Sequence, residues 1–194
     1  AESALAARNS PHLEIFRKKD IEVLLLSDRV DEWMLTGLTE YAGKPLQSVA
    51  KGELSLGGLE DAEEKRELDA VTGEFKDLGE RMKGVLGDKV KEVRVTHRLT
   101  DSPSCLVVDQ DDMGMSLRKL LEATGQKVPA TPPILELNPG HPLVKTLKRE
   151  QQGARFDDWA HLLYEQAMLS EGGQLEDPAA FVRRMNALLL QFAE

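Results

Sequence analysis

The sequence predicts an α+β fold that is rich in helices and contains one small sheet of three strands. Leucine and alanine are frequent, while aromatic residues make up only 5% of the 194 residues, and this composition favours helices. Three short apolar segments, each bounded by turn-forming residues, have the length of strands. The hydrophobic fraction of 41% and the charged fraction of 30% are typical of a globular chain, so extended disorder is not expected.

The beginning of the chain predicts a helix–strand–helix unit. Residues 2–8 are rich in alanine, and Pro11 suits the first turn of a second short helix. Residues 21–26 form a continuous apolar run, which is typical of a strand covered on both faces. Ser27 or Asp28 can cap the helix that follows. That helix carries apolar residues at helical spacing, namely Val30, Trp33, Met34, Leu38 and Tyr41.

A strand covered on both faces needs neighbouring strands at its two edges, and the sequence offers none close by. We therefore expect residues 1–52 to be the terminal α/β piece of a larger middle domain. Residues 53–194 are expected to form a second domain, at the carboxyl end.

The second domain begins with an acidic segment. The whole chain has 34 acidic and 25 basic residues, a net charge of −9, and residues 53–80 contribute −7 of it. This segment predicts a solvated linker helix that runs from Leu59 toward Leu78, Met82 and Val85. The negative balance argues against a general nucleic-acid binder. No apolar run approaches the ~18 residues that a membrane span needs.

The rest of the second domain combines strands and helices. Alternating or continuous apolar residues predict strands over 92–96, 105–108 and 134–137. A short helix is expected over 111–124, with Gly125 just past its end. Three helices complete the chain, over 142–152, 156–170 and 178–192, and Asp177-Pro178 is a strong start signal for the last one.

A search for catalytic and metal-binding patterns finds none. The four histidines, His12, His97, His141 and His161, lack the spacing of zinc ligands, and each is interpreted as a surface or boundary residue. A calcium-like loop from Asp109 lacks oxygen ligands at Met113 and Leu120, so its aspartates are interpreted as helix caps. Glycine-rich phosphate loops are absent from the sequence. The single cysteine, Cys105, excludes an internal disulfide and fits a reducing compartment.

Apolar stripes are the more prominent feature. Met113, Leu117, Leu120 and Leu121 form one stripe on the 111–124 helix, which either packs into its own domain or serves as an adaptable contact surface. Trp33, beside Asp31 and Glu32, is either a core residue or an exposed aromatic anchor.

The last two helices carry more apolar surface than the covering of a small three-stranded sheet requires. A second copy that supplied the same helix pair would complete a four-helix bundle, so we expect a homodimer. A monomeric helical hairpin lying on the sheet is the alternative. The expected interface consists of Trp159, Leu162, Leu163, Phe181, Val182, Met185, Leu188, Leu189 and Phe192.

Four segments of the sequence resemble a known family in the expected order. SPHLEIFRKKDIEVLLLSDRVDEWM at residues 10–34 resembles the end of the middle domain of the ninety-kilodalton heat-shock chaperones, particularly the bacterial members. Residues 93–108, 134–144 and 176–189 resemble successive parts of their carboxyl-terminal domain. The similarity covers nearly the whole chain and is weakest over residues 53–80.

The resemblance implies a homodimeric, ATP-driven chaperone of the bacterial cytoplasm that binds unfolded or partly folded client proteins and has another chaperone system as a further partner. ATP and Mg would be bound by an amino-terminal domain outside this segment, so the segment itself is not expected to be an enzyme and needs no cofactor. Client contacts are implied for Glu32, Trp33 and Thr36, and for the stripe of Met113, Leu117, Leu120 and Leu121. The alternative is a dimerisation scaffold without a client site of its own.

Overall fold

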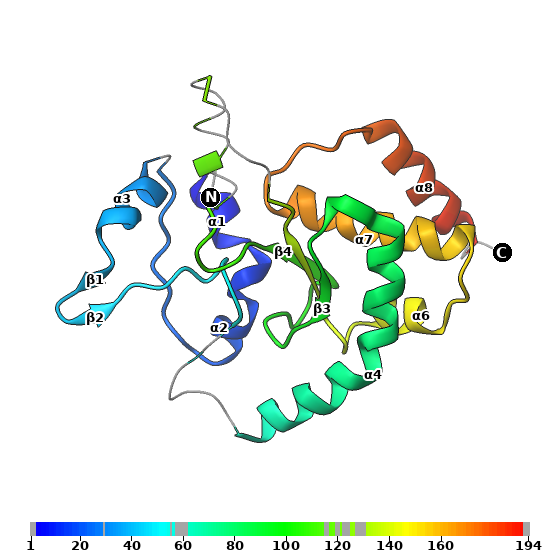
Figure 1. The fold of residues 1–194 in the computed structure, drawn as a ribbon, viewed down its shortest axis with the longest axis horizontal. Helices are drawn as coiled ribbons and strands as arrows, with labels where there is room; N and C mark the ends of the chain where they lie inside the picture. The colour runs from blue at the N-terminus through cyan, green and yellow to red at the C-terminus, as the bar shows by residue number, and fades with distance from the viewer. Residues whose placement is uncertain are drawn as a thin grey trace.

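The computed structural model describes residues 3–28, 30–54, 56, 62–114, 117–118, 121, 125–126 and 131–191, without the side chains of 62–65 and 67–68. It confirms the predicted α+β class, because helices surround a three-stranded mixed sheet (Figure 1). A second, two-stranded sheet of four residues lies near the amino-terminal end.

The three predicted strands form one sheet. Strands β3 (Val93–Val95), β4 (Ser104–Val107) and β5 (Ile134–Leu137) are arranged in the order β3-β5-β4. The central strand β5 is parallel to β3 and antiparallel to β4. This register places Glu136 beside both Arg94 and Cys105. The charged residue in the middle of β5 therefore lies at the centre of the sheet.

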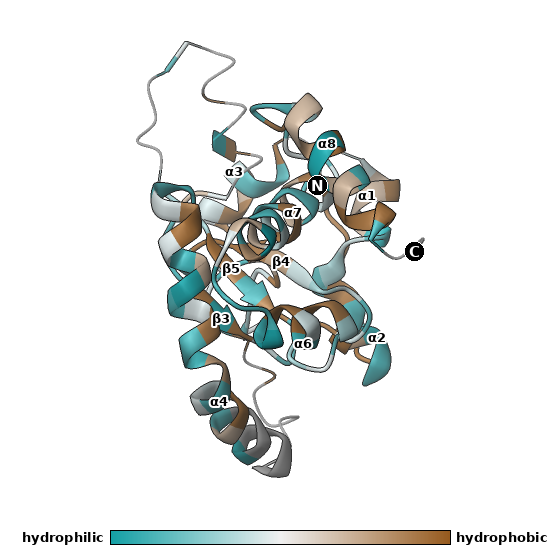
Figure 2. Ribbon diagram, turned by 90° about the vertical axis from the view of Figure 1, so that its right-hand side faces the viewer, coloured by the Kyte–Doolittle hydropathy of each residue, from teal (hydrophilic) through white to brown (hydrophobic). Residues whose placement is uncertain are grey.

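The predicted linker helix is confirmed as α4 (Ala62–Leu86), which is followed by the 3-10 turn η3 (Gly87–Lys89). One face of its second half is not solvated, however, because Leu78, Met82 and Leu86 are buried in the main core. A Cβ atom on Gly79 would lie 2.7 Å from the carbonyl oxygen of Val93, so a glycine allows α4 to approach β3 closely. The mixed teal and brown of α4 in Figure 2 reflects this amphipathic character.

The carboxyl-terminal part is helical as predicted, with α6 (Pro142–Arg149), α7 (Ala154–Ser170) and α8 (Pro178–Leu190). The Asp177 carboxylate accepts a hydrogen bond from Ala180 N at 2.9 Å, which confirms the predicted helix start. Helix α7 packs against β4 and α4, and Ser104 Oγ donates to Leu163 O at 2.8 Å. Over the residues that are described, no helix has the length and apolarity needed to cross a membrane.

The amino-terminal part contains α1 (Ala4–Arg8), a 3-10 turn η1 (Pro11–Leu13), α2 (Glu14–Lys18) and α3 (Asp31–Gly37). A small hairpin of β1 (Glu40–Tyr41) and β2 (Lys44–Pro45) follows. In Figure 1, α3 and this hairpin lie at one end of the longest axis and α8 lies toward the other.

Two predictions for the amino-terminal part are wrong. Residues 21–26 do not form a strand in this chain, because no other described segment supplies the backbone partners of a ladder. Helix α3 is also shorter than expected: neither Ser27 nor Asp28 caps it, and the Asp31 carboxylate instead accepts a hydrogen bond from Asp28 N at 2.7 Å. The helix ends at Gly37, so Leu38 and Tyr41 lie beyond it.

Candidate protein-binding surface

Exposed apolar side chains are concentrated between residues 24 and 41. They come from the extended segment before α3, from α3 itself and from the hairpin after it. The large exposed ones are Leu24, Leu25, Leu26, Val30, Trp33, Met34, Leu38 and Tyr41. We call this set the α3 apolar surface. Because these exposed apolar side chains are gathered in one part of the chain, this part is a candidate contact site for another protein segment.

Trp33 is the largest member of the α3 apolar surface. It is 66% exposed, so it is not a core residue of this structure, and its role as an aromatic anchor stays a prediction. Thr36 Oγ1 donates a hydrogen bond to Trp33 O at 2.7 Å, one turn along α3. Thr36 therefore supports the backbone that carries the tryptophan.

Glu32, the neighbour of Trp33, contacts residues that lie 82 and 85 positions further along the chain. Its carboxylate accepts hydrogen bonds from Gly114 N at 2.7 Å and from Leu117 N at 3.0 Å. Lys51 Nζ lies 3.3 Å from Glu32 Oε1 and also donates to Asp112 O at 2.8 Å. The two sets of residues that the resemblance implied as client contacts are thus brought together through Glu32.

The stripe on the predicted 111–124 helix is less accessible than a contact surface requires. Leu117 is only 6% exposed, and Met113 and Leu121 are partly buried. Leu120 lies outside the described residues. Residues 111–114 are not helical, although 117, 118 and 121 are, and Gly125 has the positive φ expected after a helix. In this structure Leu117 belongs to the interior.

The residues of the expected dimer interface fall into two groups. Trp159, Leu162, Leu163 and Leu188 are buried in the chain's own core, so α7 uses its apolar surface against β4 and α4 within one chain. These four residues are thus covered within one chain, whereas Leu169 of α7 is 44% exposed, and the dimer interface stays a prediction.

The second group lies on α8. Val182 is 46% exposed and Leu189 is 58% exposed, while Phe181 and Met185 are partly buried against the core. Phe192 lies outside the described residues. Helix α8 is the part of the expected interface that still presents apolar side chains to solvent.

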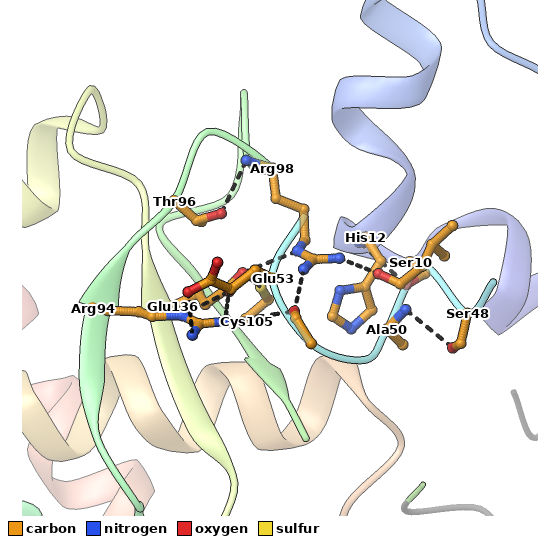
Figure 3. A network of polar contacts seen from close by, with 12 residues as sticks. Ser10, His12, Ser48, Ala50, Glu53, Arg94, Thr96, Arg98, Cys105 and Glu136 are labelled. Carbon is orange, nitrogen blue, oxygen red and sulfur yellow. Dashed lines mark hydrogen bonds and ion pairs between the residues drawn. The ribbon is translucent and has the colours of Figure 1, made fainter. Parts of the chain in front are cut away.

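A buried charge cluster joins the sheet to the segment that precedes the acidic helix (Figure 3). Arg98 and Glu136 are each 1% exposed, with Arg98 Nε 2.9 Å from Glu136 Oε2. Arg94 Nη2 lies 2.7 Å from Glu136 Oε1. Arg98 also donates to Gly52 O at 3.0 Å and to Val49 O. Burial alone would raise the pKa of Glu136, but the two guanidinium groups outweigh it, so this pKa is lowered.

A second polar contact joins the amino-terminal part of the chain to the backbone of residues 100–102. The Glu14 carboxylate accepts hydrogen bonds from Thr100 N at 2.6 Å, Asp101 N at 2.8 Å, Ser102 N at 3.1 Å and Ser102 Oγ at 2.5 Å. Burial would raise the pKa of Glu14, but the hydrogen bonds from Ser102, Asp101 and Thr100 lower it overall. The sequence interpretation missed both anchors, although a charged residue inside the apolar strand around Glu136 was a usable signal.

Three of the residues considered for catalysis or metal binding, His12, Asp109 and Cys105, are buried or paired with other side chains in the fold. His12 is buried and its Nε2 lies 2.8 Å from Oε1 of Glu171, at the end of α7. Its interpretation as a surface or boundary residue is therefore wrong. Asp109 pairs with Lys91 rather than capping a helix. Burial raises the pKa of the Cys105 thiol well above its usual value. Over the described part of the chain, no three side chains of the metal-ligating types come together.

Comparison with known proteins places this fold in a family. The family model described as "Hsp90 protein" matches residues 1–194, so the chain belongs to the Hsp90 family. It is 62% identical over 194 residues to the chaperone protein HtpG of Nitrosococcus oceani, covering 100% of this chain and 31% of that protein.

Two further relatives bear the same name. The chain is 60% identical over 191 residues to the chaperone protein HtpG of Nitrosomonas eutropha, and 61% identical over 190 residues to that of Aromatoleum aromaticum. These alignments cover 98% of this chain and 30% and 29% of the relatives. The chain thus spans less than a third of the length of the proteins it matches. It corresponds to one segment of a chaperone of the Hsp90 family.

Proposed function

We propose that this chain is the part of a chaperone that binds unfolded or partly folded proteins through the α3 apolar surface and pairs with a second copy through α8. The observation that carries the client-binding part is Trp33, a large aromatic side chain two-thirds exposed among other exposed apolar residues. The family relationship supports it, since the relatives are named chaperone proteins.

The proposed surface suits weak and reversible binding. Complete burial of one apolar side chain is worth roughly 1.5–3 kcal/mol, and binding must offset the lost freedom of the partner. Two or three client side chains seated beside Trp33 would therefore give modest affinity with little sequence selectivity. ATP hydrolysis, which the family resemblance implies, would belong to a part of the longer protein that this chain does not include.

A pair of matched substitutions tests the client-binding proposal. Trp33→Arg places a charge at the centre of the α3 apolar surface, and it should weaken binding of a permanently unfolded model protein, measured by fluorescence anisotropy. Leu5→Arg is the control, because Leu5 is 71% exposed on α1, outside that surface. Equal client affinity in the two variants would contradict the proposal.

The second candidate is a dimerisation scaffold without a client site, and the burial of Leu117 favours it. Both candidates share the dimer, which sedimentation at tens of micromolar chain tests. They differ in the anisotropy experiment, since a pure scaffold would bind no unfolded protein in any variant. If the chain sedimented as a monomer, both candidate functions would lose the proposed role of α8 in dimerisation.

A further inference from the structure

One contact joins the helix that carries Trp33 to the segment that carries Leu117. Glu32 comes from α3, and its two carboxylate oxygens accept from different backbone amides, those of Gly114 and Leu117. Hydrogen bonds to a charged acceptor are stronger than neutral ones. The Glu32 side chain is only 22% exposed, so solvent competes little for these amides.

Lys51, which follows the β1–β2 hairpin in the sequence, completes the contact. Its backbone forms a bridge with Val108, and Gly52 N donates to Val108 O at 2.8 Å. From this fixed position the ammonium group of Lys51 reaches both Glu32 and the carbonyl oxygen of Asp112. The carboxylate is therefore held between an anchored cation and two amides.

Gly114 makes room for the carboxylate. A Cβ atom at this position would lie 2.1 Å from Glu32 Oε1 and 2.7 Å from the carboxyl carbon. Any other residue would force the Glu32 side chain away from its partners. The close approach depends on a glycine at this one place.

The two apolar side chains next to this contact differ in their exposure to solvent. Trp33, next to Glu32, is 66% exposed, whereas Leu117, whose amide Glu32 accepts, is 6% exposed. We propose that Glu32 and Lys51 form a latch that holds Gly114 and Leu117 against α3 and keeps Leu117 covered. Opening the latch would add Leu117 to the apolar surface offered to a client. The inference rests on the proposed client-binding function.

The substitution Gly114→Ala tests the latch while leaving the chemistry of Glu32 and Trp33 intact. It should displace the carboxylate and speed hydrogen exchange at the amides of positions 114 and 117 by about tenfold, the scale of one lost charged hydrogen bond. Gly37→Ala is the matched control, because that α3 glycine has no heavy atom within 4 Å of the added Cβ position.

A second variant keeps the test decisive if Gly114→Ala disturbs folding. Glu32→Gln preserves the shape of the side chain but replaces one accepting oxygen with an amide that cannot accept, so exchange at position 114 or 117 should also accelerate. Unchanged exchange in Glu32→Gln, and in a folded Gly114→Ala, would overturn the latch whatever the client affinity.

Measuring the binding of the unfolded model protein then distinguishes a failure of the latch from a failure of the proposed function. Faster exchange together with tighter binding of the unfolded model protein by Gly114→Ala supports both. Faster exchange in a chain that binds no unfolded protein in any variant supports the latch and overturns the proposed function.

Discussion

Replacing Glu136 with glutamine should destabilise the fold more than any surface change, because it breaks a buried charge cluster without changing its shape. Glu136 and Arg98 are each 1% exposed, and Arg94 approaches the same carboxylate. The Glu136→Gln side chain fills the same space in β5 but removes the counter-charge of the buried Arg98, whereas Arg94 keeps Glu92 at 3.2 Å.

The size of the effect follows from this burial. Removing one partner of a buried ion pair costs about 3–5 kcal/mol, because the remaining charge is left uncompensated away from water. A folded domain is stable by only about 5–15 kcal/mol. The substitution is therefore expected to remove a large part of the free energy of unfolding and to free the 49–52 segment that Arg98 holds.

Urea unfolding followed by circular dichroism measures the loss, with Glu80→Gln as the matched control. Glu80 pairs with Lys76 at 4.0 Å on the exposed face of α4, where such a pair is worth less than about 1 kcal/mol. A loss in Glu136→Gln no larger than that in Glu80→Gln would refute the reasoning.

The pH dependence gives the same experiment a second readout. The pKa of Glu136 is lower in the fold than its ordinary value of 4.5, so its ionised form stabilises the fold above that pH. This stabilisation is lost as the pH falls through the lowered pKa. The difference between wild type and Glu136→Gln should therefore shrink on acidification.

Two further predictions concern polar groups at the join and in the core. Glu14→Gln removes the anionic acceptor of the 100–102 turn and should cost about 1–3 kcal/mol at neutral pH in urea unfolding. Because the pKa of Glu14 is lowered in the fold, the loss in free energy of unfolding should disappear as the pH falls through the lowered pKa. A loss that stayed constant with pH would contradict the stabilising role of the ionised Glu14. Cys105 is buried and the pKa of its thiol is raised, so it should react with a thiol reagent only after unfolding, and rapid labelling of the native chain would be inconsistent with this.

Much of the fold could be predicted from local pattern. The strands β3, β4 and β5 follow from short apolar segments between turn residues, and α8 follows from the cap and proline at Asp177-Pro178. The same reasoning failed at residues 21–26, because a continuous apolar run reports the capacity to be a strand and not the presence of strands beside it.

The candidate surface could be predicted only in part. Periodicity places Leu117 and Leu162 on apolar stripes, but it cannot tell which stripe the chain itself covers. That outcome depends on long-range contacts such as the one between Glu32 and Leu117, which are 85 residues apart. For the same reason, the sequence could not decide whether Trp33 is buried or exposed; in the structure it is exposed.

The order of the strands has a consequence for synthesis of the chain on the ribosome. The central strand β5 is made last, and its pairing with β3 joins residues such as Arg94 and Glu136 that are 42 positions apart. Until Ile134–Leu137 emerges from the exit tunnel, the two outer strands have no shared partner and Arg98 has no counter-charge. Helix α7, which packs against α4 and β4, is made later still, so part of α4's apolar face stays uncovered during that delay. Apolar surface that is exposed in this way favours aggregation before folding is complete.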